Sequence, residues 1–128
     1  MSAQHPRPLS PHLQVYKLPV TGIISITHRL TGVLLSVGLL YVVCLLSALA
    51  SGPEAYASVQ SFASSWWMRG LAWGFIYALF FHLCHGVRHL IWDAGHSFEH
   101  ETLKRYAFFE LAASVLLTLV SFVLLNAD

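Results

Sequence analysis

The sequence predicts an all-α membrane protein with three transmembrane helices, and three observations support this class. Of the 128 residues, 56% are hydrophobic and only 10% are charged, whereas an average soluble domain is about 25% charged. Three apolar runs are long enough to cross a bilayer. Segments rich in proline, glycine or charge separate these runs, and the length suits a single domain, residues 1–128.

The first part of the chain is predicted to be an extended arm followed by a span. Residues 1–22 are polar and interrupted by four prolines, which disfavour a helix. Leu30 to Ala50 is a stretch of 21 residues without a charge, enough to cross a hydrocarbon core of roughly 30 Å. We therefore expect a first transmembrane helix over about residues 24–50. Gly52 and Pro53 end it, and residues 51–65 are expected to form a loop.

The second and third spans are expected over about residues 66–92 and 106–125. Tryptophans occur at both ends of the second span, as in the aromatic belts of membrane interfaces. The segment between them, residues 95–105, is polar and charged.

The distribution of Lys and Arg predicts the orientation. Such residues occur before or at the start of the first span and between the second and third spans, whereas residues 51–65 contain none. The positive-inside rule then places the N-terminus in the cytoplasm and the C-terminus in the periplasm. We expect the bacterial inner (cytoplasmic) membrane rather than the mitochondrial inner membrane, because the arm lacks the arginine-rich pattern of a transit peptide.

Several function classes are disfavoured by composition. A net charge of +1 with seven Lys and Arg residues gives no basic face for nucleic acid. Cys44 and Cys84 lie in apolar runs and form no CxxC pattern, which argues against a disulfide framework, a zinc site and a covalent c-type haem. Eight histidines are an unusual number for so apolar a chain, since histidine in a membrane is costly and usually functional.

The first polar motif opens the first span. Ser25, His28 and Arg29 are spaced three and four residues apart, and Gly32 continues the same helical face. One interpretation is that His28 and Arg29 extend to the lipid head groups. The other is a polar face turned into the bundle, where Arg29 can pair with an anionic group and Ser25 or His28 can bind a carbonyl oxygen.

The second motif is the histidine-rich end of the second span. At about 100° per residue, His82, His89 and Asp93 share one axial stripe, with His85 about 60° away. Such a stripe must face a cavity, a partner or a cofactor. Haem ligation, a proton or ion path, structural polar packing and another metal site all remain open. Zinc needs three or four converging ligands, and no Cys/His set has that spacing in the sequence.

Depth in the membrane favours His82 as a haem ligand. It lies eleven residues before Asp93 and therefore well inside the bilayer, whereas His85 is a shallower candidate. Propionates of a haem on His82 would point toward Arg29, which can bind carboxylates strongly. A six-coordinate haem needs a second ligand, which we expect from another subunit. Arg88 and Asp93 are expected to form a structural ion pair or to hold soluble subunits.

Three segments together resemble the cytochrome b subunit of succinate dehydrogenase, the larger haem-binding membrane anchor. Residues 7–16 look like that family's N-terminal arm. Residues 25–32 are similar to its S-x-x-H-R-x-[ST]-G signature, and residues 82–95 to its H-x-x-x-G-x-R-H-x-x-x-D-x-G signature. The resemblance covers nearly the whole chain.

This resemblance implies a role in electron transfer. It implies one haem b bound between this chain and a second small anchor subunit, with His82 as the axial ligand to the iron and His28 and Arg29 near a propionate. It implies that Ser25 and Arg29 belong to a ubiquinone site. The implied partners are the second anchor, an iron–sulfur subunit and a flavoprotein that oxidises succinate. A quinol-oxidising fumarate reductase is an alternative, and a small His/Asp proton-relay protein is another.

Overall fold

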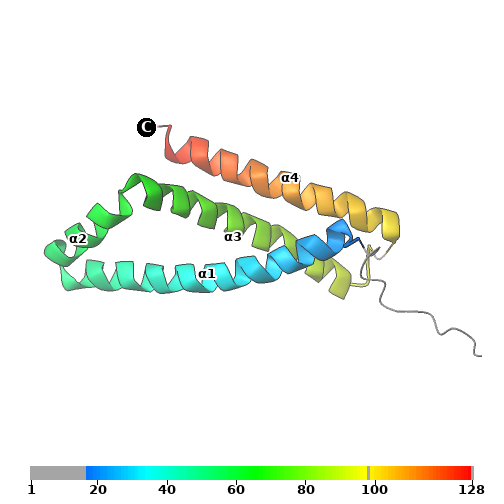
Figure 1. Ribbon diagram of the computed structural model, residues 1–128, viewed down its shortest axis with the longest axis horizontal. Coiled ribbons are helices and arrows are strands. Elements are labelled where there is room, and N and C mark those ends of the chain that lie inside the picture. Colours follow the sequence, from blue (N-terminus) through cyan, green and yellow to red (C-terminus); the bar gives the residue numbers. More distant parts are fainter. Residues whose placement is uncertain (1–16, 98, 128) are drawn as a thin grey trace, which may run out of the picture.

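The computed structural model describes residues 17–97 and 99–127, and within these residues every regular element is a helix. The arm motif at residues 7–16 lies outside the described residues. Four helices follow one another along the chain: α1 (Val20–Ser51), α2 (Pro53–Ala63), α3 (Trp66–Asp93) and α4 (His100–Leu125). Figure 1 shows α1, α3 and α4 running alongside one another, with the short α2 at the end where α1 turns into α3.

Three of these helices are long and apolar enough to cross a membrane: Val20–Ser51, Trp66–Asp93 and Glu101–Leu125. The predicted all-α class with three spans is therefore confirmed. Most large apolar side chains on the helices are exposed in the isolated chain. In lipid this exposure carries no hydrophobic cost, because lipid tails are as apolar as the side chains.

The helices differ from the local predictions in three places. Residues 51–65 were expected to form a loop, but Pro53–Ala63 form α2. Gly52 separates α1 from α2 with a φ of 113°, a conformation that suits glycine, and Pro53 occupies the first turn of α2, where its missing N–H costs nothing. Helix α4 begins at His100 rather than near residue 106, and α1 already begins at Val20, inside the predicted arm.

The buried core lies where the three long helices converge. Ile24 from α1, Phe81 from α3 and Ala107 from α4 form one apolar cluster, each 3% exposed or less. Ile24 and Ala107 lie in the first halves of their helices and Phe81 in the second half of α3, toward the end of the molecule where α1 and α4 begin and α3 ends (Figure 1). Both polar motifs lie at this end, so the core fixes the helices around them.

Candidate functional site

His82 on α3 is held by Thr31 on α1. Its Nδ1 lies 3.2 Å from the hydroxyl oxygen of Thr31. That hydroxyl already donates its one hydrogen to the carbonyl oxygen of His28, at 2.8 Å. The hydroxyl must therefore accept from His82, so Nδ1 of His82 carries the proton. In the neutral imidazole, Nε2 is then left with a free lone pair, which is the form that binds a metal.

Gly32 makes room for the His82 ring. A Cβ atom at position 32 would lie 3.1 Å from Cε1 of His82, tighter than ordinary van der Waals contact. The glycine predicted on the polar face of α1 therefore lets the imidazole approach the backbone. His82 itself is only partly buried, so its free nitrogen is not enclosed by this chain alone.

The other residues of the first motif differ in their contacts and exposure. The His28 ring stacks on the His82 ring, with 4.0 Å between centroids and 16° between planes. Ser25 is half-buried and Arg29 is exposed. Neither Ser25 nor Arg29 makes a side-chain hydrogen bond to another residue within 17–97 or 99–127.

A buried charged group between α3 and α4 went unrecognised in the sequence. His85, Arg88 and Glu110 are each 3% exposed or less. Glu110 binds the Arg88 guanidinium through one carboxylate oxygen and lies 2.6 Å from Nδ1 of His85 through the other. Arg88 also donates to the carbonyl oxygen of Leu103, at 2.8 Å.

The expected Arg88–Asp93 ion pair is therefore wrong. Asp93 is exposed at the last residue of α3, while Arg88 points into the interface with α4. Glu110 is the one acidic residue in the apolar part of α4, and a carboxylate there needs a cationic partner. This isolated acidic residue is the feature of the sequence from which the ion pair could have been predicted.

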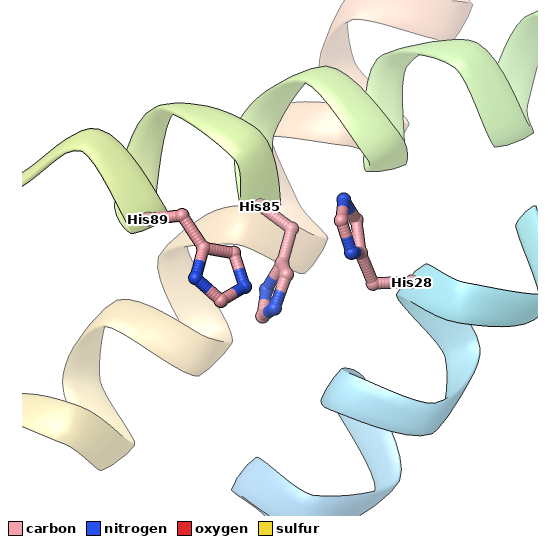
Figure 2. Close-up of side chains that lie close together, drawn as sticks. All are labelled: His28, His85 and His89. Carbon is pink, nitrogen blue, oxygen red and sulfur yellow. The ribbon is translucent and has the colours of Figure 1, made fainter. Parts of the chain in front are cut away.

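The exposure of the α3 histidines differs from that expected for the predicted stripe. His89, like Asp93, is exposed, and His85 is the buried member of the set. Figure 2 shows His85 and His89 projecting from α3 toward His28 on α1. The ligand atoms of these three side chains lie within 4.8 Å of one another. Spacing along the sequence did not reveal this set, because His28 comes from a different helix.

Known proteins of one family are similar to this chain over most of its length. The family described as "Succinate dehydrogenase/Fumarate reductase transmembrane subunit" matches residues 3–121. A succinate dehydrogenase cytochrome b556 subunit from Paracoccus denitrificans is 38% identical over 117 residues, which cover 91% of this chain and 90% of the relative. A succinate dehydrogenase cytochrome b560 subunit from Reclinomonas americana is 34% identical over 124 residues, with 92% and 85% covered.

Proposed function

Because the chain belongs to the succinate dehydrogenase/fumarate reductase transmembrane subunit family, we propose that it anchors a succinate dehydrogenase, binds haem b and helps form the ubiquinone site. Residues 1–128 then act as one membrane-anchor domain, and succinate oxidation takes place on another subunit. The names of the related cytochrome b556 and b560 subunits support the haem. The single observation that carries the proposal is the setting of His82.

The residues around His82 fit a haem iron. Thr31 fixes the proton on Nδ1 and leaves Nε2 free, and an outer hydrogen bond of this kind orients a ligating imidazole. Gly32 provides the space for the ring. Because His82 is only partly buried, a second small anchor subunit could supply a second ligand to the same group. Bound haem supplies a one-electron redox centre.

His28 and Arg29 are suited to the neighbourhood of a haem propionate. His28 contacts the ring of His82 directly, and Nε2 of His28 is buried with no hydrogen-bond partner in the described part of the chain. Arg29 follows it at the helix surface and carries a permanent charge. A guanidinium binds a carboxylate by strong, charge-assisted hydrogen bonds, so Arg29 would hold the acidic edge of the haem.

Ser25 and Arg29 are proposed to bind the quinone. They are four residues apart on one face of α1, and their polar groups are open to a ligand. Quinone reduction places negative charge on the carbonyl oxygens. Hydroxyl and guanidinium donors stabilise that charge when they are already in position. The remaining contacts would come from the partner subunits.

We place the N-terminus of this chain in the cytoplasm and its C-terminus in the periplasm of a bacterial inner membrane. The basic residues near the start of α1 and the start of α4 lie at one end of the bundle (Figure 1), which agrees with the positive-inside rule. The iron–sulfur and flavoprotein subunits would then dock at the end that holds His28 and His82. The family also includes fumarate reductase anchors, so quinol oxidation is the alternative direction.

The haem assignment is tested on the purified complex. His82→Ala should abolish or alter the reduced b-type absorption band, because the iron loses an axial ligand. His96→Ala is the matched control, since His96 is exposed beyond the end of α3 and its loss should leave the band intact. An unchanged band in His82→Ala would refute the assignment.

The quinone assignment is tested by separating the two half-reactions. Arg29→Ala should lower succinate:quinone reductase activity, while succinate oxidation with an artificial acceptor survives. Equal loss of both activities would count against a quinone role for Arg29.

A further inference from the structure

Three imidazole side chains converge on one point between α1 and α3, namely those of His28, His85 and His89. Their ligand atoms lie within 4.8 Å of one another (Figure 2). Nitrogen ligands at about 2.0–2.1 Å from a tetrahedral zinc are about 3.4 Å apart. Small side-chain rotations would bring the three nitrogens to that spacing, and the exposed His89 has the freedom to make them.

The hydrogen bonding of His85 shows which kind of ligand this point favours. Glu110 is ionised, since it pairs with Arg88, and an ionised carboxylate only accepts hydrogen bonds. Nδ1 of His85, 2.6 Å from Glu110, must therefore be the donor. Nε2 of the neutral ring then presents a lone pair, which attracts a cation and repels an anionic group.

That lone pair has nothing to bind within the described residues. His85 is 2% exposed, and its Nε2 and that of His28 are both buried without a hydrogen-bond partner among residues 17–97 and 99–127. A buried polar atom left unpaired is costly. A carboxylate behind a histidine whose other nitrogen is free is the arrangement that supports metal-binding histidines.

We propose that His28, His85 and His89 form an inhibitory binding site for a divalent transition metal ion, with zinc as the ion of first choice. Imidazole nitrogens suit zinc, and three protein ligands with one open position are a common zinc set. The exposed His89 provides the entry side, while Glu110 orients His85 from behind. The ion would not be the haem iron, whose proposed ligand is His82.

Inhibition follows from the shared position of His28. Its ring stacks on His82, and it precedes Arg29 on α1. Because the same Nε2 of His28 is proposed to lie near a haem propionate, an ion bound to it would compete with that contact. The metal binding does not depend on the proposed function, whereas the inhibition rests on that function.

The binding test uses the purified complex after chelation, with zinc chloride as the probe and calorimetry with metal analysis as the measurements. Wild type should bind one zinc ion. The affinity of His89→Ala for that ion should be at least tenfold lower. His85→Gln should have the same effect, but His89 is exposed, so its truncation tests the site without disturbing the core. His96→Ala is the matched control and should bind zinc as the wild type does.

The outcomes separate this proposal from the haem assignment. His82→Ala should still bind zinc whatever its effect on the haem band. Zinc binding that is equal in wild type, His89→Ala and His85→Gln, or absent from all three, would overturn the site. Zinc should also lower quinone reductase activity in wild type but not in His89→Ala, and a chelator should restore it. Bound zinc without such a difference would overturn the inhibitory role.

Discussion

The interface between α3 and α4 and the interface between α1 and α3 both use polar side chains, but in opposite ways. Between α3 and α4, Arg88 and Glu110 are almost fully buried, and Glu110 binds both Arg88 and His85. Between α1 and α3, the rings of His28 and His82 are only partly buried. The first interface pairs its opposite charges within the chain and leaves Nε2 of His85 unpaired among the described residues. The second keeps more of its polar groups available to ligands and partners.

The comparison teaches that buried charges paired within the chain are structural, whereas an imidazole with an unpaired nitrogen can bind a ligand. A buried ion pair is costly to break, because either partner left alone is an uncompensated charge. A half-buried imidazole costs little free energy when no ligand is bound to it. A hydroxyl that bonds one of its nitrogens keeps the ring oriented. The following substitutions test this contrast, starting with the largest expected effect.

Glu110→Ala should be the most damaging change. It leaves the Arg88 charge buried without a partner, at a cost of about 3–5 kcal/mol, and we expect the assembled complex to lose resistance to denaturation by detergent. In the double variant Arg88→Leu/Glu110→Leu, both charges are removed, and much of the stability should return. A stable Glu110→Ala complex would show that α3 and α4 do not depend on the pair.

Thr31→Val should weaken haem binding while leaving the helices assembled. The substitution keeps the shape of the side chain and removes the hydroxyl that accepts from Nδ1 of His82. Loss of such an outer partner typically lowers metal affinity about 10–100-fold. Haem per complex, measured after washing with detergent, should fall. Thr27→Val serves as the control, because that hydroxyl bonds only the backbone of its own helix within the described residues.

Gly32→Ala should have a smaller effect on the same ring. The added Cβ would approach Cε1 of His82 to 3.1 Å, so the ring must shift by a few tenths of an ångström. We expect a changed haem spectrum or midpoint potential with most haem retained. Gly70→Ala is the comparison, since a Cβ there meets no atom within 4 Å. Identical spectra for both variants would show that the ring tolerates the contact.

Asp93→Asn should have the smallest effect on folding of the chain. Asp93 is exposed, and surface substitutions of this kind usually change stability by less than about 0.5 kcal/mol. Detergent resistance of the complex should match the wild type. A loss comparable to that of Glu110→Ala would mean that the two carboxylates are equally structural, and the contrast would fail.

Much of the fold followed from hydrophobicity and length. The three spans are apolar over enough residues to cross a bilayer, and a segment in lipid has to satisfy its own backbone hydrogen bonds by forming a helix. The helix α2 was missed because a Gly-Pro break precedes it, and such a break is typical of loops. The early start of α4 was missed because residues 100–105 include Glu101, Lys104 and Arg105. Charged residues indicate where a membrane span ends, but a helix can continue beyond that point.

The sequence by itself determined the membrane class and the two motifs, including the positions of Ser25, His28, Arg29 and His82. These depend on periodicity and spacing along one helix. Only the tertiary structure decided that Glu110 pairs with Arg88 in place of Asp93, and that His28 joins His85 and His89. Such pairings depend on how one helix is rotated against another. That rotation is set by side-chain packing across the interface, around Ile24, Phe81 and Ala107, which no single helix specifies.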